Sequence, residues 1–104
     1  MPGHQDFLKP NKVVVFSKSY CPFCKKSQNM FKEMGVEVDW YECDLGEVSE
    51  DVVTDLKKST GQNTFPQVFV GTTFTKGCDD NMALRKSGKL VQLLNEKGIP
   101  FTNP

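Results

Sequence analysis

Two cysteines, Cys21 and Cys24, lie two residues apart in the stretch S-K-S-Y-C-P-F-C-K-K. An apolar, β-branched run from Val13 to Phe16 precedes this stretch, and a helix-like pattern follows it. A strand that leads into C-x-x-C at the start of a helix is the arrangement of a redox dithiol, which an intracellular chain favours over a structural disulfide. The spacing therefore predicts thiol–disulfide chemistry.

The residues around Cys21 favour its ionised form. The thiolate is the nucleophile in disulfide exchange, and an ordinary free thiol with a pKa of about 8.5 is only ~3% ionised at pH 7. The first turn of a helix stabilises a thiolate through unpaired N–H groups and the positive end of the helix dipole, and Pro22 suits that turn because its φ is preset. Lys18 adds a nearby cation. We expect Cys21 to attack and the more deeply buried Cys24 to resolve the intermediate.

The alternative interpretation of the C-x-x-C motif is that its two cysteines are half of the ligands of a zinc site. A zinc ribbon needs a second C-x-x-C or a paired set of Cys and His ligands. The remaining candidates are Cys43, Cys78 and His4, which have no recognised ligand spacing. The sequence therefore predicts no metal site, and we expect His4 to be a surface residue of a mobile terminus and Cys43 to be a small buried hydrophobe.

The overall charge is balanced, with 13 Lys and Arg against 13 Asp and Glu. This composition favours neither nucleic acid nor a membrane surface as a partner. The longest apolar run in the first 20 residues has only four members, which is too short for a signal-peptide core or a spanning helix. We therefore expect a cytoplasmic protein, in which thiols are kept reduced.

The hydrophobic pattern predicts one domain over residues 1–104, with a short N-terminal arm at 1–11 that has one helical turn. Alternating or β-branched stretches predict strands at 12–16, 36–43, 67–70 and 72–75. Helical periodicity follows each of the first two strands, and a split helical region follows the fourth. We expect Ser49 to cap the second helix and either Asp79 or Asp80 to cap the third.

The predicted order of elements is β-α-β-α-β-β-α. The first two strands should be parallel through a right-handed crossover, and the last two should form an antiparallel hairpin around Gly71. The sequence thus predicts an α/β fold with a four-stranded mixed sheet and helices on both faces. The dithiol would lie at the carboxyl end of the first strand, where open α/β sheets bind ligands.

Three stretches of the chain, in this order, resemble the dithiol glutaredoxins. V-V-V-F-S-K-S-Y-C-P-F-C resembles the strand and redox motif of the family, T-F-P-Q-V-F-V at 64–70 resembles its T-V-P segment with a cis proline, and G-C-D-D at 77–80 resembles its G-G-x-D-D segment. A thioredoxin would instead have W-C-G-P-C. The resemblance extends from about residue 12 to residue 97 and implies a thioredoxin-like fold.

The resemblance also implies an activity, that of a glutathione-dependent thiol–disulfide oxidoreductase with Cys21 and Cys24 as its redox pair. Glutathione is then the co-substrate, and no metal is expected. The implied protein substrates are glutathionylated or disulfide-containing proteins, and we expect the chain to act as a monomer.

A glutathione groove is a further implication of the resemblance, and its residues come from all three stretches. Lys18 and Gln62 would bind the carboxylate at the glycine end of the tripeptide. Phe65 would pair its backbone with the cysteinyl part, and a cis Pro66 would hold that backbone open beside the sulfurs, at a cost of only about 0.5–1 kcal/mol over the trans form.

The other end of the implied groove lies at the start of the third helix. Cys78 and Asp79 would receive the γ-glutamyl end of glutathione through backbone N–H groups, the carboxylate and the helix N-terminus. Tyr20 and Phe23 would line the groove beside the sulfurs.

The chain departs from the family pattern at two places on this rim. Phe65 replaces the usual Val, and Lys76–Gly77 replaces a Gly–Gly pair. Both changes could alter the preference for protein substrates, while Cys78 adds a thiol near the groove.

A glutaredoxin that carries a [2Fe–2S] cluster, bridged between two subunits by Cys21 and two glutathiones, is the alternative function. Pro22 argues against this alternative, because cluster-binding members of the family usually have Gly or Ser after the first cysteine.

Overall fold

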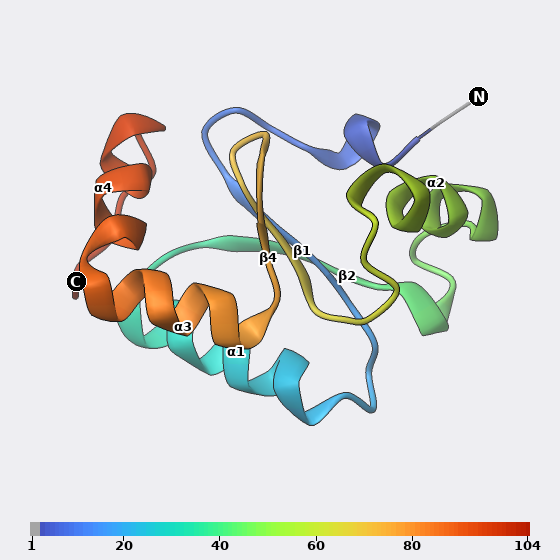
Figure 1. Cartoon of the computed structure of the whole chain (residues 1–104), viewed down its shortest axis with the longest axis horizontal. Helices are drawn as coiled ribbons and strands as arrows, with labels where there is room; N and C mark the ends of the chain where they lie inside the picture. Colours follow the sequence, from blue (N-terminus) through green and yellow to red (C-terminus); the bar gives the residue numbers. More distant parts are fainter. Residues whose placement is uncertain (1–2) are drawn as a thin grey trace.

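The computed structural model describes residues 3–104 and contains the predicted elements in the predicted order (Figure 1). A 3₁₀ turn, η1 (His4–Phe7), precedes the first strand, and a second, η2 (Cys43–Leu45), follows the second strand. The strands and helices are β1 (Val13–Ser17), α1 (Pro22–Met34), β2 (Val38–Glu42), α2 (Glu50–Thr60), β3 (Gln67–Val70), β4 (Thr73–Lys76), α3 (Cys78–Ser87) and α4 (Lys89–Glu96).

The four strands form one mixed sheet in the order β2-β1-β3-β4. β1 pairs in parallel with β2 and antiparallel with β3, and β3 and β4 form the predicted hairpin, which turns at Gly71 with φ 63°. The central strand β1 is completely buried, as its continuous apolar run predicts. The predicted α/β class and mixed sheet are therefore confirmed.

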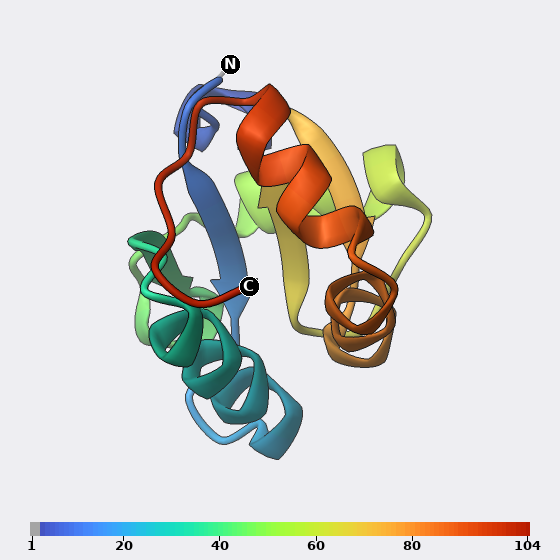
Figure 2. The same cartoon turned by 90° about the vertical axis from the view of Figure 1, so that its left-hand side faces the viewer.

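Helices cover both faces of the sheet, because successive residues of β1 point to opposite sides. Val13 and Val15 pack with residues of α1 and α4, and Val14 and Phe16 pack with residues of α2. In Figure 2, α1, α3 and α4 lie in front of the sheet and the green α2 lies behind it. Over residues 3–104, no helix has the length and hydrophobicity needed to cross a bilayer.

Helix α1 begins directly at the redox motif. Cys21 is its N-cap residue and Pro22 occupies its first turn, as predicted. The predicted inward stripe is buried along the helix, at Ser27, Met30, Phe31 and Met34. Gly35 ends the helix in the left-handed region with φ 73°. The stripe thus fixes the start of α1, and with it Cys21, at the carboxyl end of β1.

The N-terminal segment contradicts the prediction for His4. This residue is only 5% exposed, and its ring Nδ1 lies 2.7 Å from Oδ2 of Asp55 in α2. The hydrogen bond from His4 holds the pKa of Asp55 below its usual 3.8. The resulting stability is present above pH 3.8 and is lost as the pH falls through the lowered pKa. The prediction failed because the partner lies 51 positions away in the sequence.

The cap of α3 also differs from the prediction. Gly77 is the N-cap residue, and Asp80 lies in the first turn, where its Oδ2 accepts a hydrogen bond from the N–H of Gly77 at 3.3 Å. Asp79 is exposed beside it. The carboxylates of Asp79 and Asp80 are therefore within the first turn of α3, two and three residues after the cap.

Candidate active site

The two cysteines of the C-x-x-C motif differ in exposure as predicted. Cys21 is half-buried, and its Sγ donates a hydrogen bond to the backbone carbonyl of Phe65 at 3.6 Å. Cys24, one turn into α1, is only 1% exposed. Both are free thiols. The geometry therefore makes the sulfur of Cys21 accessible to a substrate and keeps that of Cys24 inside.

Burial determines the ionisation of Cys24. Loss of hydration raises the pKa of this thiol to about 11, against the opposing effect of hydrogen bonds from the Ser17 hydroxyl and the Lys18 backbone. Burial likewise raises the pKa of Cys43 to about 11. Cys43 is half-buried and packs against the cluster under α2, which is close to its predicted role as a small hydrophobe.

Alkylation of the native protein should therefore be selective. With a pKa of about 11, Cys24 and Cys43 are ~0.1% ionised at pH 8, so iodoacetamide should modify Cys21 well before either. Their rates should rise about tenfold per pH unit as the pH approaches 11. Mass spectrometry of timed samples measures this order, and modification of Cys24 as fast as Cys21 at pH 8 would contradict it.

The loop at 62–66 brings a backbone carbonyl to Cys21. The Phe65–Pro66 peptide bond is cis, as predicted. Nε2 of Gln62 donates hydrogen bonds to the carbonyls of Thr64 and Pro66 at 3.0 and 3.1 Å, and the buried Gln67 donates to the carbonyl of Gln62 at 2.6 Å. The amide of Gln62 thus holds the loop together, and its role as a ligand stays a prediction.

Two lysines lie against the ring of Phe65. Nζ of Lys18 is 5.2 Å from the ring centroid, and Nζ of Lys57 in α2 is 5.7 Å from it. Both distances are within the range of cation–π contacts. Lys18 was predicted to belong to the site, but Lys57 was not, because no pattern in the sequence places this part of α2 beside the loop. The ring and the two lysines form a cationic region next to the dithiol.

The start of α3 is fixed to β4 by buried polar contacts. Asn81, which is fully buried, donates from Nδ2 to the carbonyls of Thr75 and Gly77 at 3.1 and 2.6 Å. The hydroxyl of Thr75 donates to Oδ1 of Asn81 at 2.7 Å. These bonds hold the first turn of α3, with Cys78 and Asp79, in a defined position.

A groove of about 400 Å³ joins the loop to the start of α3. Nine residues line it, of which six were predicted to belong to the site and three were not. The lining residues are Phe23, Gln62, Thr64, Phe65, Pro66, Gly77, Cys78, Asp79 and Asp80. The volume is within the range of small-molecule sites. Tyr20 lies outside the lining and is 74% exposed. The structure therefore brings most of the predicted residues together around one groove.

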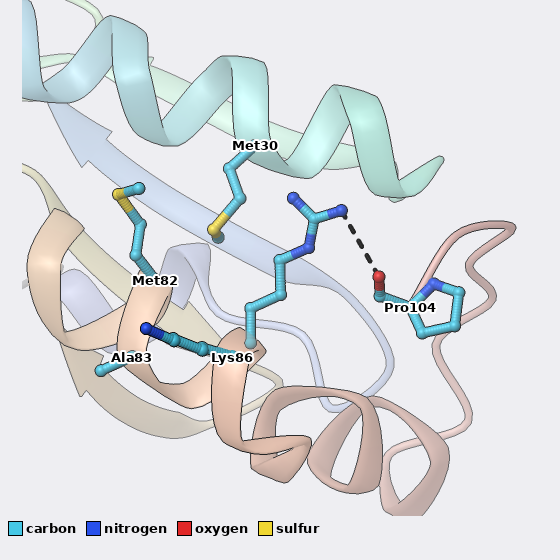
Figure 3. Close-up of a pocket in the computed structure, with 6 residues that line it drawn as sticks. Met30, Met82, Ala83, Lys86 and Pro104 are labelled. Atoms are coloured by element: carbon cyan, nitrogen blue, oxygen red, sulfur yellow. Dashed lines mark hydrogen bonds between the residues drawn. The ribbon is translucent and has the colours of Figure 1, made fainter.

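A second hollow, of about 470 Å³, lies between α1 and α3 (Figure 3). Met30 and Met82 point into it from the two helices, and a hydrogen bond joins Arg85 to the carbonyl of Pro104 at 3.4 Å. None of the predicted site residues lines this hollow. Its lining is largely apolar side chains with cations at the rim, so it offers no thiol or carboxylate for the chemistry of the groove.

The sequence matches the family model named Glutaredoxin over residues 13–75. The chain is 43% identical to Glutaredoxin-C6 of Oryza sativa subsp. japonica over 86 residues, which are 83% of this chain and 77% of that protein. It is 37% identical to Glutaredoxin-C2 of Arabidopsis thaliana over 98 residues, covering 94% of this chain and 88% of the relative.

Solved structures agree with these matches. The crystal structure of a wheat glutaredoxin superposes with a TM-score of 0.81 at 41% identity, over 89% of this chain and 88% of the wheat chain. The crystal structure of a buckwheat glutaredoxin–glutathione complex superposes with a TM-score of 0.80 at 36% identity, over 90% and 86% of the two chains. The fold, the dithiol and these relatives agree, and the chain belongs to the glutaredoxin family.

Proposed function

We infer that the chain is a glutathione-dependent thiol–disulfide oxidoreductase, with Cys21 as the attacking thiol and Cys24 as the resolving thiol. One observation carries the assignment of roles: Cys21 is the half-buried N-cap of α1 beside the groove, and Cys24 is buried one turn later. Only the sulfur of Cys21 can meet a disulfide brought from solvent, whereas Cys24 can meet only Cys21.

The first step is attack by the Cys21 thiolate on the glutathionyl sulfur of a mixed disulfide. A sulfur–sulfur bond forms between Cys21 and glutathione, and the substrate protein leaves as a thiolate that takes up a proton from water.

Two routes can then clear the Cys21–glutathione intermediate. In one, the thiolate of a second glutathione attacks the bound glutathionyl sulfur, forming oxidised glutathione and releasing the Cys21 thiolate. In the other, Cys24 attacks the sulfur of Cys21, which expels glutathione and leaves the Cys21–Cys24 disulfide. The first route needs one cysteine of the protein and the second needs both.

The charges around the groove suit glutathione, which has carboxylates at both ends and an ammonium group at its γ-glutamyl end. The ammonium groups of Lys18 and Lys57 lie beside Phe65 and can attract the glycine carboxylate. The first turn of α3 offers backbone N–H groups to the γ-glutamyl carboxylate, and the carboxylates of Asp79 and Asp80 can attract the ammonium group. The buckwheat relative has been solved in complex with glutathione.

A coupled assay tests this function. The protein is mixed with glutathione, glutathione reductase, NADPH and a small mixed disulfide of glutathione, and consumption of NADPH is followed. We expect turnover that depends on both glutathione and the protein. Turnover that continues without glutathione, fed by a thioredoxin-type reductase, would contradict the proposed reductant.

The [2Fe–2S] carrier function remains the alternative, and the same protein can test it. A cluster held by Cys21 and glutathione absorbs visible light, whereas a dithiol does not. Pro22 occupies the first turn of α1 directly after Cys21 and stiffens the loop. We therefore expect no visible absorption after anaerobic reconstitution with iron, sulfide and glutathione, and a stable coloured dimer would favour the alternative.

The wider setting belongs to the same proposal. We expect a monomer that acts on glutathionylated or disulfide-containing proteins in a reducing compartment such as the cytoplasm. The four free thiols are consistent with a reducing environment.

A further inference from the structure

A buried hydroxyl connects the resolving cysteine to a carboxylate. Ser17, the last residue of β1, is fully buried, and its hydroxyl lies close enough to the sulfur of Cys24 to favour the thiolate and lower the pKa of that thiol. The same hydroxyl donates to Oε2 of Glu42 at 3.3 Å. The hydroxyl of Ser17 therefore stands between the sulfur of Cys24 and the carboxylate of Glu42.

The strand register places Glu42 beside this hydroxyl. Glu42 is the last residue of β2 and pairs with Ser17 across the parallel strands. The indole N–H of Trp40 donates to Oε1, the other carboxylate oxygen of Glu42. One oxygen is thus held by Trp40 and the other faces Ser17. The half-buried carboxylate can exchange protons with water while its inner oxygen contacts the buried hydroxyl.

Cys24 needs a proton acceptor, because a thiolate must form before the sulfur can attack. Burial opposes its ionisation, and a side chain that is 1% exposed has almost no water to take the proton. Ser17 and the backbone N–H of Lys18 donate hydrogen bonds that stabilise the thiolate once it has formed. These donors lower the cost of the charge, but the proton itself must still leave the interior.

The other ionisable groups near Ser17 are engaged differently. The carboxylate of Asp44 accepts hydrogen bonds from the backbone and hydroxyl of Ser19, with the backbone contact at 2.9 Å. Glu47 accepts from the backbone N–H of Glu42 at 3.3 Å. Burial raises the pKa of Cys43, and the positive charge of Lys18 opposes that rise only in part. Among residues 3–104, the carboxylate that hydrogen-bonds the Ser17 hydroxyl is that of Glu42.

We propose that Glu42 accepts the proton of Cys24 through the hydroxyl of Ser17 during the resolving step. The inference rests on the proposed function. The Cys24 thiol passes its proton to Oγ of Ser17 as the Ser17 hydroxyl proton moves to Oε2 of Glu42. The Cys24 sulfur then bonds to the Cys21 sulfur, and the bond between Cys21 and glutathione breaks. The Cys24 sulfur is oxidised, the Cys21 sulfur exchanges one disulfide bond for another, and the glutathionyl sulfur is reduced and leaves as a thiolate that is protonated by water.

The same path serves the reverse step. When a glutathione thiolate attacks the Cys21 sulfur of the Cys21–Cys24 disulfide, Cys24 leaves as a buried thiolate. Glu42 returns the proton through Ser17. Ser17 is then a catalytic residue, because it touches a reacting sulfur, and Glu42 is a positioning residue that moves the proton through it.

The test isolates the resolving step. Reduced protein is mixed with oxidised glutathione, samples are quenched with acid, and mass spectrometry follows the Cys21–glutathione adduct and its conversion to the internal disulfide. Glu42→Gln and Ser17→Ala should each slow this conversion by roughly 10- to 100-fold at pH 7. The rate should rise about tenfold per pH unit in both variants, because hydroxide replaces the missing acceptor, while the wild-type profile stays flatter. Glu42→Asp should restore part of the rate.

Two comparisons separate a proton path from a structural effect. Glu47→Gln removes the neighbouring carboxylate, which bonds a backbone N–H and not Ser17, and should retain the wild-type rate and pH profile. Attack of external glutathione on the adduct, measured in the Cys24→Ser background, gives the rate of the route that needs no proton from Cys24. Glu42→Gln should lower the ratio of internal to external rates.

Equal slowing of both routes, or a Glu42→Gln profile identical to that of the wild type, would overturn the proton path. Failure of the wild-type protein to form any Cys21–glutathione adduct would instead overturn the proposed function. The two failures are therefore distinguishable in the same experiment.

Discussion

Cys21→Ser is expected to abolish activity on both glutathione mixed disulfides and protein disulfides, whereas Cys24→Ser should lose most of its activity only on protein disulfides. A serine hydroxyl is essentially un-ionised at neutral pH, so the first attack fails without the sulfur of Cys21. Glutathione from solution can clear the Cys21 intermediate without Cys24. When the bound partner is a protein thiol, however, the internal attack by Cys24 is needed to release it.

Kinetics with the two kinds of substrate measure this difference, and mass spectrometry checks its basis. Cys24→Ser treated with oxidised glutathione should carry one adduct, on Cys21. Cys78 lines the groove, so its peptide is the control position that must remain unmodified. If Cys24→Ser were inactive on the small mixed disulfide while Cys21→Ser stayed active, Cys24 would be the attacking thiol and Cys21 the resolving thiol.

Lys18→Gln and Asp79→Ala should each lower kcat/KM for glutathione-containing substrates by roughly 10- to 100-fold. Each substitution removes one charged contact with an end of the ligand, and a charge-assisted hydrogen bond contributes about 1.5–3 kcal/mol. Lys18 lies against Phe65, and Asp79 lines the groove at the first turn of α3. The coupled assay at varied concentrations of mixed disulfide measures the effect.

Lys58→Gln is the matched control for the loss of a lysine. Lys58 is exposed on α2 one residue after Lys57, and it does not line the groove. Its kinetics should match the wild type at the same ionic strength. If Lys18→Gln and Asp79→Ala also matched the wild type, the glutathione site would have to lie elsewhere.

Local patterns predicted the part of the fold that presents the dithiol. The apolar run of β1 is buried on both faces, and the stripe from Ser27 to Met34 is the inner face of α1. Pro22 and Gly35 lie at the two ends of that helix, as their backbone preferences predict. Such features depend on residues within a few positions of one another, so a single sequence contains the information.

The features that escaped prediction depend on contacts between distant segments. Lys57 reaches Phe65 from α2, His4 contacts Asp55, and Ser17 contacts Glu42 across two strands. Helical periodicity predicts which side of α2 faces the core, but it does not predict that the loop with Phe65 lies beside Lys57 on the outer side of this helix. The backbone of Lys76 is a related case. Its φ of 71° lies in the left-handed region, which explains why the family usually has glycine at this position. A lysine in the sequence gives no sign of this backbone conformation.

The contact between His4 and Asp55 changes where the folded unit begins. The family match starts at residue 13, but His4 and Phe7 already pack on the aromatic side chains of the sheet, with ring centroids 5.7 Å apart for His4 and Phe69 and 5.0 Å apart for Phe7 and Tyr41. A recombinant chain trimmed to the family boundary would uncover these rings and become prone to aggregate. Residues from His4 onward therefore belong in any shortened version intended for crystallisation or labelling.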